Sequence, residues 1–272
     1  MDKGSSYDKN ILTEKIMIKL SVSSMDTFDK CPKKYNYRYI ERVKVDAQPQ
    51  VFTEFGSCAH LILELFHQRA NRDTSQDDYS SIMKQCFIDA VKDPQFNPTL
   101  LRSYVWSPTG DRPGLEYLKE ISQAYLDKMR KEGMPNVIGT EVPYELEIKK
   151  GVVVRGYIDR IDMPEPGHYR VIDYKTSKNP KYLKSFQLLT YSLAISNMYP
   201  DVKKTSGSFM LLKHDFKEVD YNFGTMEIDK CARSIIKKAD SILAEKVWKK
   251  NPTRLCDYCD YKNLCFGVWA EE

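Results

Sequence analysis

The sequence predicts an α/β domain in which a mixed central sheet is flanked by helices, and three observations lead to this class. Residues 156–162 and 171–176 are apolar, strand-like segments separated by proline and glycine, which is typical of two strands joined by a turn. Apolar residues recur at helical spacing in residues 115–129 and 227–248. With 272 residues, of which 42% are hydrophobic and 29% charged, the chain can bury a sizeable core without disulfides.

The remaining elements follow from the same patterns in chain order. Residues 1–20 are polar and rich in lysine, so we expect an N-terminal arm there and a single domain over residues 21–272. A short helix is expected to be capped by Ser23 or Ser24 and to end before Pro32. The other expected elements are helices at 56–66, 79–92 and 183–199, a loop at 94–114, strands at 142–148 and 152–154, and a hairpin of 206–213 with 219–223.

Three charged side chains of the two central strands are expected to share one patch. Asp173 and Lys175 are two residues apart and therefore lie on one face of the second strand, and Asp159 can lie opposite them on the first. Hard divalent cations such as Mg²⁺ are held by one or two carboxylates together with water and substrate phosphate. A lysine beside such a cation stabilises negative charge on a phosphoryl group. The patch therefore indicates metal-assisted hydrolysis of phosphodiesters.

The simpler interpretation of an Asp-x-Lys sequence is a surface ion pair, which contributes little to stability. A surface position is disfavoured because both strands are apolar around these charged residues, which favours burial. The apolar neighbours are Val171, Ile172, Ile158 and Ile161. A buried carboxylate without a partner is costly, so it needs a metal or a base beside it.

Other polar residues extend the candidate site. His60 lies in the expected buried helix, where a single histidine is more often a hydrogen-bonded core residue than a metal ligand. Glu141 precedes Pro143, which implies an edge strand or a bulge that either turns Glu141 toward the site or leaves it hydrogen-bonded locally. Gln187 and Tyr191 are four residues apart on one helical face, where they either hold a nucleotide or cap a strand end.

The seven cysteines are better explained as metal ligands and buried thiols than as disulfides, because their number is odd and no secretion signal precedes them. Cys256, Cys259 and Cys265 have the spacing of metal ligands, and Cys31 is the natural fourth ligand. Four thiolates fit either a tetrahedral zinc ion or a [4Fe-4S] cluster, and structural zinc is the commoner of the two. Either group would join the N-terminal helix to the C-terminal end of the domain.

Composition and hydropathy exclude a membrane protein and indicate an intracellular one. The net charge of +4 is too small to identify a partner. No apolar run approaches the ~20 residues that span a bilayer, and the first twenty residues lack a signal-peptide pattern. We therefore expect a cytoplasmic protein, and a phage or other prokaryotic origin suits its compact size.

The motifs together resemble the RecB-type branch of the PD-(D/E)xK nucleases, particularly its iron-sulfur members, such as the CRISPR-associated RecB-like exonucleases and the AddB-type nuclease domain. The resemblance covers residues 23–265 and joins six motifs in the family's order. They are the serine-rich opening that ends at Cys31, Gly-x-x-x-His at His60, Gly-Tyr-Ile-Asp at Asp159, Ile-Asp-Tyr-Lys at Lys175, Gln-x-x-x-Tyr at Tyr191, and the terminal cysteines. Asp159 follows isoleucine instead of the literal proline, a departure usual for this branch.

The resemblance implies a restriction-endonuclease-like core and a role for each matching residue. His60, Asp159 and Asp173 would ligate the metal with the carbonyl of Tyr174, and Lys175 would position or activate the attacking water. Glu141 matches the family's upstream acid. The binding surface for the DNA strand would include Gln187 and Tyr191, and a [4Fe-4S] cluster would be held by Cys31, Cys256, Cys259 and Cys265.

The resemblance also implies the activity of a Mg²⁺- or Mn²⁺-dependent DNA exonuclease that acts on single strands or ends in recombination, repair or DNA processing. Its partner would be a helicase, recombinase or CRISPR-type protein. One alternative is a non-catalytic DNA-binding scaffold subunit of a helicase or recombinase complex; another is an endonuclease or flap nuclease. Degenerate relatives lose one or more ligands, whereas His60, Asp159, Asp173 and Lys175 are all present here, which favours an enzyme.

Overall fold

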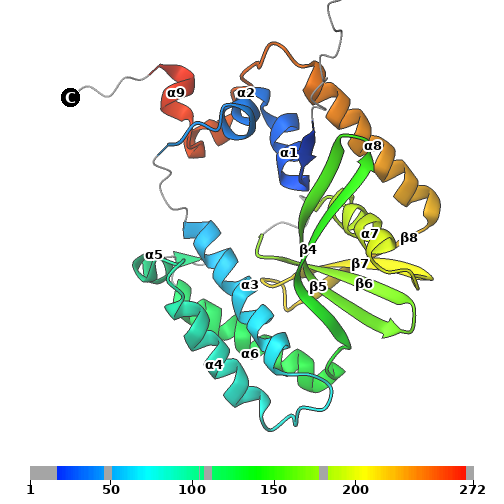
Figure 1. The fold of residues 1–272 in the computed structure, drawn as a ribbon. Helices are drawn as coiled ribbons and strands as arrows, with labels where there is room; N and C mark the ends of the chain where they lie inside the picture. The colour runs from blue at the N-terminus through cyan, green and yellow to red at the C-terminus, as the bar shows by residue number, and fades with distance from the viewer. Residues whose placement is uncertain (1–16, 46–50, 104, 107–111, 178–182, 268–272) are drawn as a thin grey trace, which may run out of the picture.

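A mixed six-stranded sheet forms the centre of the protein in the computed structural model, which describes residues 17–45, 51–103, 105–106, 112–177 and 183–267 (Figure 1). Its strands run in the order β1-β5-β6-β7-β8, and β4 pairs with β5. The pairs β1/β5 and β6/β7 are parallel, and the other neighbours are antiparallel. The strands are β1 Ile18–Leu20, β4 Val137–Lys149, β5 Val152–Glu165, β6 His168–Lys175, β7 Lys204–Leu211 and β8 Lys217–Phe223. The mixed α/β class predicted from the sequence is confirmed.

Helices cover both faces of this sheet (Figure 1). On one side lie α3, α4 and α6, and on the other lie α7, α8 and the N-terminal α1. The helices are α1 Val22–Lys30, α2 Pro32–Tyr35, η1 Asn36–Ile40, α3 Val51–Arg69, α4 Tyr79–Lys92, α5 Pro98–Ser103, α6 Gly114–Glu132, α7 Phe186–Met198, α8 Thr225–Ala244, η3 Arg254–Tyr258 and α9 Lys262–Phe266. A two-stranded sheet of β2 Val105–Trp106 and β3 Arg112–Pro113 lies outside the central sheet.

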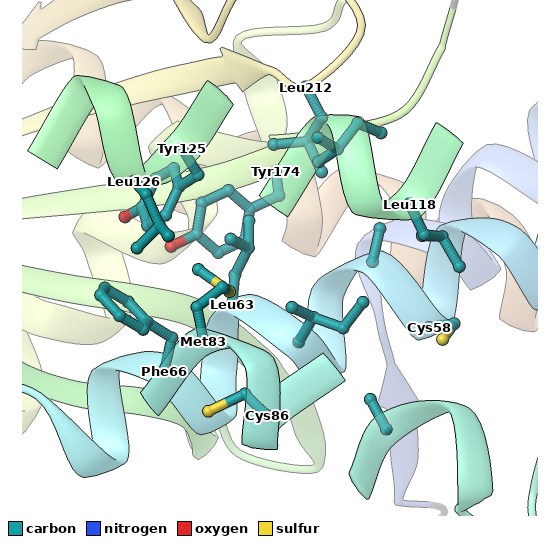
Figure 2. Close-up of a cluster of buried hydrophobic side chains, with 14 of the residues drawn as sticks. Cys58, Leu63, Phe66, Met83, Cys86, Leu118, Tyr125, Leu126, Tyr174 and Leu212 are labelled. Atoms are coloured by element: carbon teal, nitrogen blue, oxygen red, sulfur yellow. The ribbon is translucent and has the colours of Figure 1, made fainter. Parts of the chain in front are cut away.

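Alternation along β6 divides the core into two clusters, because successive side chains of a strand point to opposite faces. Ile172 and Tyr174 pack against α3, α4 and α6, whereas Val171 packs against α7 and α8. Figure 2 shows the first cluster, in which Tyr174 from the sheet lies among side chains of the helices, including Phe66 and Tyr125. The middle of the sheet is therefore buried on both faces, with β6 between the two clusters.

Three expectations about individual elements need correction or completion. Helix α1 is capped by Ser21, not by Ser23 or Ser24, and Ser24 completes a capping box with it. The stretch expected to be a loop at 94–114 contains the helix α5 and the strands β2 and β3. Of the expected N-terminal arm, residues 1–16 lie outside the described residues, and Ile18–Leu20 form β1 beside β5.

Candidate active site

The antiparallel pairing of β5 with β6 brings the two aspartates of the motifs together. Arg160 is paired with Ile172, and continuing this register places Asp159 opposite Asp173. Oδ2 of Asp159 accepts a hydrogen bond from the backbone N–H of Tyr174 at 2.8 Å. Asp173 is only 2% exposed. Both carboxylates are therefore fixed by the sheet and largely removed from water.

Helix α3 adds His60 to these carboxylates. Nδ1 of His60 lies 3.4 Å from Oδ2 of Asp159, and the backbone of Tyr174 also hydrogen-bonds the histidine ring. One turn earlier, a Cβ on Gly56 would come within 3.1 Å of Oγ1 of Thr176, so the glycine lets the helix approach the end of β6 closely. His60 therefore lies beside the carboxylates, and its role as a metal ligand stays a prediction.

Strand β4 contributes Glu141 through an unusual backbone conformation. The φ angle of Glu141 is +45°, in the left-handed region, which costs a non-glycine residue on the order of 1–3 kcal/mol. Pro143, two residues on, pairs regularly with Tyr157, so the distortion lies at the glutamate itself. Single ligand atoms of His60, Glu141 and Asp159 all lie within 4.8 Å of one another. Glu141 therefore faces the site, as one of the two interpretations from the sequence expects.

The acids in this site crowd one another. Burial and the neighbouring charge of Asp159 raise the pKa of Glu141 to about 7. Burial raises the pKa of Asp159 to about 6, and burial with the charge of Asp159 raises the pKa of Asp173 to about 6. Burial lowers the pKa of His60, which favours the neutral ring that ligates metals. A divalent cation is the natural partner for this set of donors.

Asp173 lies beside that group in a ring of polar contacts with Lys175 and helix α7. Oδ2 of Asp173 lies 2.6 Å from Nζ of Lys175. The ammonium donates a hydrogen bond to Oε1 of Gln187 at 2.9 Å, and the Gln187 amide donates to the hydroxyl of Tyr191 at the same distance. The Tyr191 hydroxyl closes the ring at 3.4 Å from Oδ1 of Asp173. Gln187 and Tyr191 thus share one helical face, as their spacing predicts, and that face contacts the lysine.

A buried ion pair behind the site was not expected from the sequence. Arg160 is 2% exposed and Asp162 3% exposed, and Nε of the arginine lies 2.9 Å from Oδ1 of the aspartate. Nη1 of Arg160 also donates hydrogen bonds to the hydroxyls of Tyr125 and Tyr174, at 2.7 and 3.0 Å. The pair could have been predicted from the sequence, because an arginine and an aspartate occupy alternate positions among apolar residues of β5. Alternate positions of a strand share one face.

Glu64 is a second residue that reasoning from the sequence missed. It lines a cavity of about 280 Å³ together with His60 and Glu141, and its charge contributes to the raised pKa of Glu141. Its signal was the four-residue spacing from His60, which puts both side chains on one face of α3.

The four cysteines expected to bind one metal group lie around a single small cavity. Cys31 follows the last residue of α1, and Cys256, Cys259 and Cys265 come from the C-terminal segment that contains η3 and α9. Burial raises the pKa of the Cys265 thiol, and the three neighbouring cysteines add to the shift. The four cysteines thus lie around one cavity, and the metal group that they would hold stays a prediction. The other three cysteines, at positions 58, 86 and 231, are buried in the protein core.

Within the described residues, no helix has the length and apolar character needed to cross a bilayer.

Comparisons with known proteins agree with the motifs. The sequence profile of the PD-(D/E)XK nuclease superfamily matches residues 19–266. One of the subunits of an ATP-dependent helicase/deoxyribonuclease from Streptococcus agalactiae is 26% identical over 188 residues, which cover 66% of this chain but 16% of that protein. The Gene 69 protein of Mycobacterium phage L5 is 27% identical over 233 residues, covering 72% of this chain and 77% of the phage protein.

A crystal structure of a candidate exonuclease from Eubacterium rectale aligns with a TM-score of 0.49 at 13% identity, covering 93% of this chain and 98% of that one. The profile match extends over nearly all of the described sheet and helices. The chain therefore belongs to the PD-(D/E)XK nuclease superfamily.

Proposed function

We propose that the protein is a Mg²⁺- or Mn²⁺-dependent DNA exonuclease that acts on single strands or DNA ends during recombination, repair or DNA processing. One observation carries the proposal: donor atoms of His60, Glu141 and Asp159 lie within 4.8 Å of one another. Beside them, Asp173 pairs with Lys175 at 2.6 Å. A non-catalytic scaffold would not need to keep this costly arrangement of buried acids.

The donor set fits a divalent cation. Mg²⁺ and Mn²⁺ prefer oxygen ligands with an occasional imidazole. His60, Asp159, Asp173 and the Tyr174 carbonyl would hold the ion, with Glu141 beside them. Within the described residues, Oδ2 of Asp173 has its lysine neighbour but no well-directed hydrogen bond, which leaves it able to bind a metal. When bound, the cation would polarise the phosphodiester and lower the pKa of water.

The side chain of Lys175 has the position needed to act on the phosphate. Its ammonium is held between Asp173 and Gln187, at 2.6 and 2.9 Å. From there it would orient the attacking water and neutralise the negative charge that develops on the phosphoryl oxygens during in-line attack. Gln187 and Tyr191 fix the direction of the lysine and face the incoming strand. We assign catalysis to Lys175 and the carboxylates, and positioning to the two α7 residues.

For the cysteine site we propose a [4Fe-4S] cluster, with zinc as the alternative. Cys31, Cys256, Cys259 and Cys265 would be its ligands, since they surround one cavity. The cluster would join the end of α1 to the C-terminal segment, a structural role separate from the cleavage site.

The names of the relatives also suggest with which kinds of protein the nuclease acts. The streptococcal protein is named a helicase/deoxyribonuclease subunit, and this chain spans 16% of its length. We propose an intracellular nuclease that receives unwound strands from a helicase or works beside a recombinase or CRISPR-type protein.

Cleavage of end-labelled oligonucleotides tests the proposed function. With Mg²⁺, the protein should release label from one end of single-stranded DNA, and EDTA should stop the release. Asp173→Asn and Lys175→Gln should lower the rate by at least about a hundredfold, because each removes charge from the reacting site. The matched control is Lys203→Gln, an exposed lysine elsewhere. Cleavage in EDTA, or variants as active as the parent, would contradict the assignment, and internal fragments would identify an endonuclease.

A further inference from the structure

We propose that a groove beside the active site binds one DNA strand through Tyr157 and Arg155. This inference rests on the proposed function and adds how the substrate is held. The groove has a volume of about 830 Å³ and is bounded by β4, β5, α7 and the start of α1. Pockets that hold small organic ligands have volumes of about 300–1,000 Å³. Because Gln187 and Tyr191 belong both to the lining of the groove and to the polar ring around Lys175, the groove borders that ring.

Strand β5 runs from the groove to the metal ligands. Arg155 and Tyr157 occupy alternate positions and therefore share one face of the strand, and Asp159 follows two residues later. Arg155 and Tyr157 are exposed, the tyrosine by 62%, whereas Asp159 reaches the site. Two residues of a strand span about 7 Å. A DNA strand that follows β5 from the groove to the site would have the neighbour of its scissile nucleotide over Tyr157.

Aromatic side chains make up much of the groove. Tyr144 and Tyr191 are each 5% exposed, and their rings meet edge to face with centroids 6.0 Å apart. Gly156 makes room for this arrangement, since a Cβ there would come 2.8 Å from the Tyr144 hydroxyl. Tyr157 is the exposed member of the three tyrosines. Base stacking on aromatic rings tolerates any sequence, as a nuclease that degrades whole strands requires.

The charges that line the groove favour a phosphate. Arg155 and Glu145 are its charged side chains among the described residues. The carboxylate of Glu145 is paired with Lys19 at 2.8 Å and is also affected by the charge of Arg155, which lies opposite it on β5. Two basic side chains therefore outnumber one acid at this position, which leaves a net positive charge for a ligand. Arginine binds phosphate oxygens with paired hydrogen bonds. The positive end of α1, which begins next to Ser21 at the opposite wall, adds to this preference.

Binding of fluorescein-labelled oligothymidylate in EDTA, followed by fluorescence anisotropy, tests the groove without cleavage. Tyr157→Ala should raise the dissociation constant about 5- to 150-fold, which corresponds to the loss of one stacked base. Tyr157→Phe should bind within a factor of three of the parent. Met226→Ala is the control, because Met226 is 80% exposed and lies on α8 outside the groove. Parent-like binding by Tyr157→Ala would overturn the proposal.

The salt dependence of the same oligonucleotide binding tests the role of Arg155. Arg155→Ala should weaken binding and lower the slope of log K against log salt by about one, as expected for one lost phosphate contact. Arg233→Ala removes an equal charge from an exposed position on α8 and should keep the parent slope. Equal slopes for the parent and Arg155→Ala would contradict the phosphate contact.

Two further measurements separate the groove from the nuclease activity. Metal-dependent hydrolysis of bis(p-nitrophenyl) phosphate by the unaltered protein reports the proposed chemistry on a substrate without bases. If the parent hydrolyses neither this compound nor DNA, the proposed function is wrong. The binding measurements in EDTA still test the groove in that case. A loss of blunt-duplex affinity in Tyr157→Ala as large as the loss for single strands would overturn the specificity for one strand.

Discussion

Three carboxylates that crowd one another define the site at the scale of single residues. Asp159, Asp173 and Glu141 have pKa values raised to about 6, 6 and 7, chiefly by burial. Each would be easier to bury as a neutral acid. They persist beside a left-handed Glu141, a second local cost. Such costs are tolerated where a bound ion offsets them, so the crowded acids and the strained backbone both agree with the proposed metal site.

The raised pKa values predict how the stability of the metal-free protein depends on pH. The native state holds protons that the unfolded chain has already lost between about pH 4 and pH 7, the interval between ordinary carboxyl pKa values and those of these acids. The contribution of these three acids to the free energy of unfolding should therefore fall as the pH rises through this interval. His60 and His67 contribute with the opposite sign, because burial lowers their pKa values. Urea unfolding in EDTA at pH 5 and pH 7.5 measures the difference.

Glu141→Gln should reduce that difference, since the amide cannot titrate. Added Mg²⁺ should restore stability at pH 7.5 in the parent, because an ion that binds only the native state stabilises it. The same difference in stability between pH 5 and pH 7.5 in the parent and in Glu141→Gln would contradict the account of crowded acids.

Among the elements, the pair β5 and β6 carries most of the site, and this pair is also what the sequence predicts best. Two apolar segments around a Pro-Gly turn predict a hairpin, and residues 166–167 do join the two strands. The two-residue period then places Asp159 opposite Asp173, as the register confirms. The position of helix α3 relative to the sheet, which brings His60 to the strands, depends on tertiary packing that no local pattern encodes.

Other features were missed for identifiable physical reasons. Pro98 suggests a loop, but it is the first residue of α5, where proline lacks only a hydrogen bond that the helix would not make. Ser21 caps α1 in place of the later serines because all three are good caps and only the packed structure selects one. The left-handed backbone at Glu141 could not be predicted, because glutamate has no local preference for it.

The buried Arg160 supports a prediction about the strands themselves. Arg160→Met should destabilise the protein by about 3–5 kcal/mol, because it leaves Asp162 charged and buried without a partner. The double variant Arg160→Met/Asp162→Leu should recover much of that loss, since it removes both charges. Urea denaturation at pH 7.5 measures both. A double variant no more stable than the single one would show that the unpaired charge of Asp162 is not what destabilises Arg160→Met.

At the scale of the whole molecule, the two ends of the described chain meet. The Asn251 amide donates a hydrogen bond to the carbonyl of Lys30, and the N–H of Lys33 donates to the carbonyl of Lys249. Trp248 stacks on Tyr35 with ring centroids 6.0 Å apart. These contacts hold the cysteines of both ends around one cavity. The cysteine spacing predicts three members of this set, and only folding brings Cys31 to them.

The proposed cluster predicts the effect of changing one cysteine. Cys259→Ser, in protein purified without oxygen, should lose visible absorption and lower the midpoint of thermal unfolding, because metal binding contributes to folding free energy. Cys86→Ala is the control, since Cys86 is buried in the other cluster of the core. Absorption and thermal stability equal to the parent in Cys259→Ser would disprove the cluster, and a colourless protein containing zinc would assign the site to zinc.

Direct titration with Mn²⁺, followed by the decrease of its free electron paramagnetic resonance signal, tests the central claim. The parent should bind Mn²⁺, and Asp159→Asn should weaken that binding at least tenfold, because Asp159 lies within 4.8 Å of the other donors. Asp127→Asn, an exposed position on α6, should bind like the parent. Loss of Mn²⁺ affinity together with loss of DNA cleavage in Asp159→Asn is the predicted result. Unchanged Mn²⁺ affinity in that variant would show that these residues do not form the metal site.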